Sequence, residues 1–280
     1  MTQNKERSDY VLCHPARDAG SSLDSRFHEN DKTNMNYHYA YLLGIDLLMF
    51  LPAFLLLFFW RSDLRREMCI AGLVFGIVAF LSEPIFILHY WHPEYIFPLS
   101  YAGIPLGSFE DFLYGFLKGG IAAVIYEVLF AKSFARKKNR EHQWKHMILP
   151  IYAVGVALFV LPIVLWAWNP IYTSALSSVV ILVPLALYRS DLLSEAFTSG
   201  FLVVLLTFVG YQILLVFFPG VIEAWWRLEN LSGIMISGIP IEEMLESFVV
   251  GFFGGPFYEF FKGLRLKKYI GVRDIKTAFR

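Results

Sequence analysis

The sequence has little charge and almost no cysteine. Asp, Glu, Lys and Arg make up 17% of the 280 residues, and because 24 are acidic and 24 are basic, the formal net charge is zero. This balance excludes nucleic-acid binding through bulk positive charge. The two cysteines, Cys13 and Cys69, are too few for a disulfide framework and lack metal-ligand spacing.

The sequence also lacks the Gly-x-Gly-x-x-Gly fingerprint that holds a dinucleotide. No dinucleotide-binding site is therefore predicted, and no set of residues predicts a metal site. Apolar residues are in excess at 56%, aromatic residues reach 18%, and the mean hydropathy is +0.51. Soluble domains average about 45–50% apolar and about 25% charged residues. The composition therefore predicts a membrane protein and excludes disorder of the whole chain.

Seven apolar segments are each long enough to cross a bilayer, which takes about 20 residues of helix. They cover residues 39–60, 68–90, 109–131, 147–168, 170–188, 196–218 and 241–262. We predict an all-α membrane protein with seven transmembrane helices. Trp and Tyr residues near the segment ends, such as Tyr41, Tyr90 and Trp226, are interpreted as belonging to the membrane interface, where these residue types are enriched.

The distribution of Lys and Arg predicts the orientation, because cytoplasmic loops are enriched in both. Seventeen of the 24 basic residues lie on the side that carries the first inter-helix loop and the C-terminus. The opposite side has six, five of them in the N-terminal tail, and Lys118 lies within a helix. We therefore predict an outside N-terminus and a cytoplasmic C-terminus, in an integral multi-pass protein of the plasma (inner) membrane.

The chain repeats itself. Three motifs recur: Arg-Ser-Asp-Leu at 61–64 and 189–192, an acidic pair at 110–111 and 242–243, and Tyr-Glu at 126–127 and 258–259. The offsets of 128 and 132 are nearly constant, which predicts two parallel three-helix repeats joined by a connector helix. The predicted organisation is a disordered polar tail over 1–37, a first repeat over 38–131, a basic loop and connector helix over 132–169, a second repeat over 170–263 and a basic tail over 264–280.

In the third helix of each repeat, small residues recur every four positions in a row that has an acid at each end. The rows are Asp111, Gly115, Gly119, Ala123 and Glu127, and Glu243, Ser247, Gly251, Gly255 and Glu259. Residues four apart share a helix face, and small residues let helices in lipid approach closely. We expect the rows to pack against each other or against neighbouring helices. We also expect Lys118 to neutralise Glu110 or Asp111, and Glu259 to pair with Lys262.

The acids within the predicted spans are the candidates for chemistry, because a charge in a bilayer is costly and usually functional. The candidates at the helix starts are Glu110, Asp111, Glu242 and Glu243, while Asp46 and Glu83 lie deeper. Capping of the helix dipole is the alternative role for the four acids at the starts. A carboxyl group that is kept protonated by burial can donate a proton, and aromatic faces attract cations. This combination suits carbocation chemistry on an alkene.

Two stretches resemble the integral-membrane lycopene cyclases, the flavin-independent kind found as tandem or heterodimeric three-helix domains. The first comprises Tyr90-Trp91-His92-Pro93-Glu94-Tyr95, then Gly103-Ile104-Pro105 and Phe109-Glu110-Asp111; the second is Gly238-Ile239-Pro240-Ile241-Glu242-Glu243, a Pro-x-Glu-Glu motif. The resemblance covers about residues 38–265. In the first repeat Ser108 stands where the motif has proline.

The resemblance implies a lycopene-cyclase-like isomerase or intramolecular lyase without a cofactor. Such an enzyme protonates an acyclic carotenoid, and the cation then closes an ionone-type ring without net redox change. Glu242, Glu243, Glu110 and Asp111 would carry the catalysis. Glu83, Trp91, Glu94 and Tyr95 would contact the substrate.

Two other classes of function stay open at the level of sequence. Parallel repeats with intramembrane acids also fit a proton-coupled membrane transporter, and a non-catalytic carotenoid-binding seven-helix protein is the other alternative. The expected partners are a lipophilic carotenoid and the lipid bilayer, with no nucleic acid. The sequence leaves the formation of a homo-oligomer open.

Overall fold

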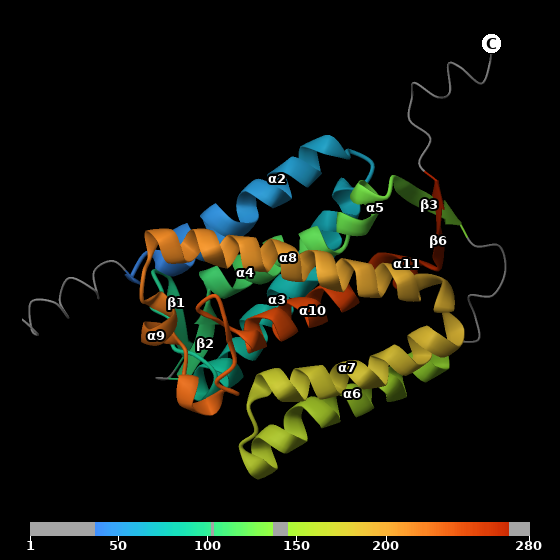
Figure 1. Cartoon of the computed structure of the whole chain (residues 1–280). Helices are drawn as coiled ribbons and strands as arrows, with labels where there is room; N and C mark the ends of the chain where they lie inside the picture. The colour runs from blue at the N-terminus through green and yellow to red at the C-terminus, as the bar shows by residue number, and fades with distance from the viewer. Residues whose placement is uncertain (1–36, 102–103, 137–144, 269–280) are drawn as a thin grey trace, which may run out of the picture. The chain divides into compact units, whose positions relative to one another are not determined.

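The computed structural model describes residues 37–101, 104–136 and 145–268, and it is mostly helical (Figure 1). The elements of its first part are η1 (Ala40–Phe50, a π-helix), α2 (Leu51–Trp60), α3 (Arg65–His89), β1 (Pro98–Tyr101), β2 (Ile104–Ser108), α4 (Phe109–Ala122), α5 (Ile125–Leu129) and β3 (Lys132–Arg136). Residues 1–36 of the predicted N-terminal tail and residues 269–280 of the C-terminal tail lie outside the described ranges.

The second part begins with an additional helix and then has long helices in the same order as the first part. Its elements are α6 (Lys145–Trp166), α7 (Pro170–Tyr188), η2 (Ser190–Leu192), α8 (Leu193–Phe217), α9 (Val221–Trp225), η3 (Leu228–Asn230), β4 (Met235–Ile236), β5 (Ile239–Pro240), α10 (Ile241–Gly254), α11 (Phe257–Lys262) and β6 (Leu264–Lys268). Helix α10 gives way to α11 at Pro256, a residue that has no N–H to continue the helix ladder.

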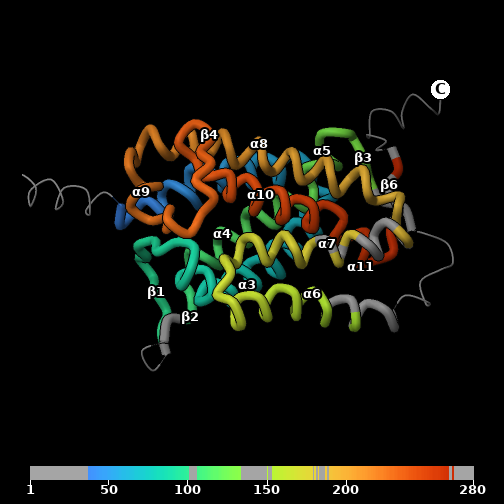
Figure 2. Tube along the Cα trace, turned by 60° about the horizontal axis from the view of Figure 1, so that its bottom comes forward, coloured from blue at the N-terminus to red at the C-terminus, as the bar shows by residue number. Residues whose placement is uncertain are grey.

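Four helical stretches in the described ranges are long and apolar enough to cross a membrane. They are Ala40–Trp60, Arg65–His89, Phe109–Leu129 and Ser190–Phe217. The chain is therefore a helical protein with the character of a membrane protein. Helices α6 and α7, which lie side by side (Figure 2), and the pair α10–α11 occupy the other three predicted segments. The count of seven spans stays a prediction.

The rows of small residues are confirmed as helix-packing surfaces. In the first repeat, a Cβ atom on Gly115 of α4 would lie 2.7 Å from the Cβ of Ala79 on α3. In the second repeat, a Cβ atom on Gly251 of α10 would lie 2.6 Å from the carbonyl oxygen of Ser199 on α8. Each third helix therefore packs closely on the second helix of its own repeat.

The basic segments that follow α5 and α11 are more ordered than the sequence predicts. Lys132–Arg136 and Leu264–Lys268 were expected to belong to a loop and a surface tail, but they pair as antiparallel strands β3 and β6. Strand β3 follows α5 and β6 follows α11, so the two strands occupy equivalent positions at the ends of the two repeats. Arg61 and Arg189 then donate hydrogen bonds to the carbonyl oxygens of Lys132 and Leu264, at 2.7 and 2.6 Å.

Several aromatic residues assigned to the membrane interface lie in the core instead. Tyr41, Tyr90 and Trp226 are 1%, 3% and 3% exposed, whereas Trp60 is 69% exposed. The first three rings therefore face the interior of the protein, and their position relative to the membrane interface stays a prediction. Their hydroxyl and indole N–H groups donate to buried carboxylates, which satisfies the polar end of each buried ring.

Candidate functional site

The two acidic pairs occupy the first turns of equivalent helices. Helix α4 begins after Ser108 and α10 after Pro240, so the two helix starts differ by 132 residues, as the acidic pairs do. The acids in these turns are Glu110, Asp111, Glu242 and Glu243, and none is more than 4% exposed. Ser108 and Pro240 are the residues directly before the two helices, and each lies two residues before the first acid of its pair. Ser108 is therefore the counterpart of the motif proline.

The first acid of each pair holds the backbone of a loop. Oε1 of Glu110 accepts a hydrogen bond from the amide of Ile96 at 2.7 Å. Oε1 of Glu242 accepts one from the amide of Ser232, also at 2.7 Å, and a second from the Tyr172 hydroxyl at 2.6 Å. Within the described residues, Oε2 of each of these glutamates is buried and has no hydrogen-bond partner.

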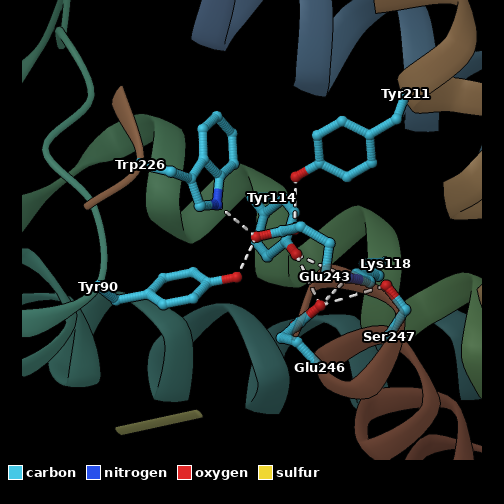
Figure 3. Close-up of polar contacts among 8 residues, drawn as sticks. All are labelled: Tyr90, Tyr114, Lys118, Tyr211, Trp226, Glu243, Glu246 and Ser247. Atoms are coloured by element: carbon cyan, nitrogen blue, oxygen red, sulfur yellow. Dashed lines mark hydrogen bonds and ion pairs between the residues drawn. The ribbon is translucent and has the colours of Figure 1, made fainter. Parts of the chain in front are cut away.

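Glu243 is surrounded by aromatic donors (Figure 3). Its Oε1 accepts hydrogen bonds from the Tyr90 hydroxyl and from the indole of Trp226, the latter at 2.7 Å, and its Oε2 accepts one from Tyr211 at 2.5 Å. The donors come from the end of α3, the segment after α9, and α8. Elements of both repeats therefore converge on one carboxylate.

Asp111 is the equivalent residue in the first repeat. Its Oδ1 accepts a hydrogen bond from the Tyr41 hydroxyl at 2.8 Å, and its Oδ2 accepts from the Ser108 amide at 2.6 Å and hydroxyl at 2.9 Å. The Ser108 hydroxyl also accepts from the Asp111 amide at 3.1 Å, which completes a capping box. The departure from proline thus gives α4 a side-chain cap that α10 lacks.

Lys118 pairs with Glu246 and not with Glu110 or Asp111, so the sequence-based expectation is wrong. The Lys118 ammonium also donates to the Tyr114 hydroxyl at 2.6 Å and lies 4.8 Å from the Tyr114 ring centroid. Lys118 is 1% exposed. Lys118 lies four residues beyond Tyr114, so the two side chains share one face of α4. Both reach Glu246 of α10, which lies about one helix turn beyond Glu243 (Figure 3).

The predicted substrate-contacting residues divide into two groups. Glu83 accepts hydrogen bonds from the Trp91 indole at 2.8 Å and the Tyr95 hydroxyl at 2.5 Å. Burial and the neighbouring charge of Glu83 raise the pKa of Tyr95 far above its usual value, so this hydroxyl remains a donor. Glu94 lies apart from this group, with its side chain 40% exposed and 3.8 Å from His38.

Aromatic rings connect these acids into one region. Tyr41 packs edge-on to Trp91 at 5.2 Å between ring centroids, Trp91 lies 5.4 Å from Trp226, and Trp226 lies 6.0 Å from Tyr211. Trp91 and Trp226 also form an isolated antiparallel bridge between their backbones. The region therefore combines buried carboxylic groups with the faces of electron-rich rings, and both favour a cationic intermediate.

The model of the lycopene cyclase family matches residues 33–129 and 169–261, which together make up more than half of the chain. The chain belongs to the lycopene cyclase family. The two matched regions cover the two repeats, so the tandem arrangement of lycopene cyclase domains is present within one chain. No curated protein and no solved structure matches the chain. Membership of the lycopene cyclase family indicates a membrane enzyme that acts on a lipophilic carotenoid.

Proposed function

We propose that the protein is a membrane carotenoid cyclase that closes an ionone-type ring by proton-initiated, redox-neutral cyclisation. The observation that carries the proposal is the surroundings of Glu243, whose carboxylate accepts three hydrogen bonds from aromatic side chains in the core. Membership of the lycopene cyclase family supplies the substrate class, an acyclic carotenoid such as lycopene.

The hydrogen bonds explain how a carboxylic acid can protonate an alkene, which is a weak base. Burial favours the neutral carboxyl group before the reaction. After proton transfer, the Tyr90, Tyr211 and Trp226 donors stabilise the carboxylate that remains on Glu243. Because these donors act mainly on the ion, they lower the energy of the charge-separated state more than that of the reactant state.

The proposed reaction has three steps. The acid transfers its proton to one carbon of the terminal double bond, which leaves a carbocation on the other carbon. The neighbouring double bond attacks this carbon, so a carbon–carbon bond forms, the ring closes and the charge moves into it. A carboxylate of the site then removes a proton from the ring. One proton is gained and one is lost, so the product is an isomer of the substrate.

Asp111 takes the corresponding role in the first repeat, with Tyr41 and Ser108 as its donors. Glu110 and Glu242 position the loops that cover the helix starts, because each accepts a loop amide. Glu83, Trp91 and Tyr95 form the adjoining part of the substrate-binding region. Glu94 lies apart from this group and is 40% exposed, so we propose that it contacts the substrate only at the surface of the protein.

We further propose seven spans, an outside N-terminus and a cytoplasmic C-terminus in the plasma membrane. The 17 basic residues on one side support this orientation. In it, the acidic pairs lie near the outer ends of α4 and α10, and the strand pair of β3 and β6 lies at the cytoplasmic end.

Expression in a host that accumulates lycopene tests the function through the pigment profile. Cyclic carotenoids are expected, and they should fall by at least about a hundredfold in Glu243→Gln, which removes the acid while keeping its size. Glu242→Gln is the matched control, since it changes the adjacent residue that holds a loop, and it should retain more activity. If lycopene stays unchanged although the protein is correctly inserted in the membrane, the cyclase proposal is contradicted. Transport or carotenoid binding would then be the remaining candidate functions.

A further inference from the structure

A second group of buried acids lies at the other end of the helices. One carboxylate oxygen each from Glu127 of α5, Glu195 of α8 and Glu259 of α11 lies within 4.8 Å of the others. All three side chains are at most 1% exposed. In the described part of the chain, no side chain outside the group donates a hydrogen bond to their six carboxylate oxygens, and Glu127 and Glu195 interact with each other. Glu259 therefore does not form the expected pair with Lys262.

The repeat adds a fourth member to this group. Glu67 on α3 is the counterpart of Glu195 at an offset of 128, just as Glu127 is the counterpart of Glu259 at 132. Glu67 is 1% exposed, interacts electrostatically with the other three acids, and also has two oxygens without a partner among the described residues. Each repeat thus contributes two glutamates, from its second and third helices, to one place.

This group is separate from the proposed cyclase site. Glu243 and Glu259 are 16 residues apart along α10 and α11, which corresponds to roughly 24 Å at about 1.5 Å per residue. Within the described residues, no hydrogen bond joins the four glutamates to the aromatic donors of Glu243. Whatever this group of glutamates binds therefore does not share the proton-donor site.

The two neighbouring guanidinium groups interact electrostatically with Glu127, Glu195 and Glu259, but two positive charges balance only part of the negative charge of the glutamates. Nη1 of Arg61 and of Arg189 donates to the main-chain oxygen of Glu127 and of Glu259, at 3.2 and 3.1 Å. The same two arginines bind carboxylates of their own motifs, Arg61 to Asp63 and Arg189 to Asp191. The hydrogen bond from Arg61 holds the pKa of Asp63 below its usual value, so this partner is ionised at neutral pH.

These four buried carboxyl groups must be neutralised either by protons or by a bound cation, because an unpaired charge in the protein interior costs much free energy. Carboxylate oxygens are the preferred ligands of Mg²⁺, Ca²⁺ and Mn²⁺. Such ions hold oxygens at about 2.0–2.6 Å, so two ligands of one ion lie no more than about 5 Å apart. The separation of 4.8 Å or less fits this requirement.

We propose that Glu127, Glu195 and Glu259 bind a divalent cation of the magnesium, calcium and manganese class, with Glu67 as a neighbouring acid that adds negative charge. The ion joins α5 of the first repeat to α8 and α11 of the second, at the end of the helices where the Arg-Ser-Asp-Leu motifs lie. Its role is to hold the two repeats together, and it takes no part in the proton transfer.

Manganese binding to the full-length protein in detergent tests the proposal. After removal of metals with a chelator and dialysis against Mn²⁺, elemental analysis is expected to find about one ion per chain. Its electron paramagnetic resonance signal should be that of a bound ion, and Mg²⁺ or Ca²⁺ should displace it. Glu195→Gln should weaken binding by at least about tenfold, since even the loss of an outer-shell partner costs about that much.

Asp46→Asn is the matched control, because Asp46 is also a fully buried acid whose two oxygens have no partner in the described ranges, but it does not belong to the group. This variant should bind manganese as the unaltered chain does. Absence of stoichiometric binding by the unaltered chain would overturn the proposal and show that the glutamates are neutralised by protons. Equal binding by Glu195→Gln, Asp46→Asn and the unaltered chain would overturn it as well, and neither outcome depends on activity.

Discussion

Glu242 and Glu243 are adjacent in the sequence and have different surroundings. Glu242 accepts hydrogen bonds from a loop amide and from Tyr172, whereas Glu243 accepts three from core aromatic residues. Successive residues on a helix point about 100° apart, so an adjacent pair necessarily faces two directions. In the proposed reaction, Glu242 positions a loop and Glu243 transfers the proton.

The Tyr211 hydroxyl provides a test of this division. Tyr211→Phe removes the donor to Oε2 of Glu243, so the carboxylate left after proton transfer is less stable. The rate of cyclisation should fall by about a hundredfold, as for the loss of one donor to a developing anion. Tyr172→Phe is the control, since it removes a donor to Glu242 and should have a smaller effect. The measurement is turnover of lycopene by purified protein; equal losses would contradict the division.

The sequence predicted the paired acids but not their partners. The motif spacing identified Glu110, Asp111, Glu242 and Glu243, because local patterns repeat at a fixed offset. The aromatic donors come from segments 17 to 153 residues away from Glu243, and such contacts depend on the tertiary fold. Their type suggested the membrane interface, which is the commoner place for Trp and Tyr in membrane proteins.

Another repeated acid follows from the sequence itself. The offset of 128 that relates the two Arg-Ser-Asp-Leu motifs also relates Glu67 to Glu195, which lie three residues beyond these motifs. The convergence of Glu195 with Glu127 and Glu259 depends on the tertiary fold, because the three residues lie on separate helices.

At the scale of elements, the close contact of α8 with α10 fixes where Glu243 lies. Gly251 allows this contact, since a Cβ atom at this position would lie 2.6 Å from the backbone oxygen of Ser199. Van der Waals packing is a main source of helix association in lipid. The glycine row is therefore a structural requirement of the site.

Gly251→Val should separate α8 from α10. Forcing extra atoms into such a contact costs about 1–3 kcal/mol, so the variant should unfold at a lower temperature in detergent. Gly155→Ala is the control, because a Cβ atom there meets only the Ser177 hydroxyl at an ordinary 3.5 Å. Thermal unfolding followed by circular dichroism provides the measurement. An unchanged midpoint for Gly251→Val would show that the contact is not required.

The helices were more predictable than the strands. Long apolar segments and periodic small residues predict helices and their packing faces from local sequence alone. The pairing of β3 with β6 joins segments 128 to 136 residues apart through short basic sequences, and neither segment alternates clearly enough to predict a strand.

For the whole molecule, the proposed orientation can be tested by thiol labelling in intact cells. In a background in which Cys13 and Cys69 are replaced by serine, Ser62→Cys and Glu229→Cys place single thiols at exposed positions. An impermeant reagent should label Glu229→Cys in intact cells and Ser62→Cys only after permeabilisation. The opposite labelling pattern would reverse the proposed topology.

The central claim is that a proton from the protein starts the cyclisation and that another proton leaves the ring. Purified protein turning over lycopene in D₂O tests this claim directly by mass spectrometry of the cyclic product. Because a deuteron enters and a proton leaves, the product should carry one additional deuterium for each ring closed. In ordinary water, substrate and product should have the same mass. A cyclic product formed in D₂O without deuterium would contradict the account.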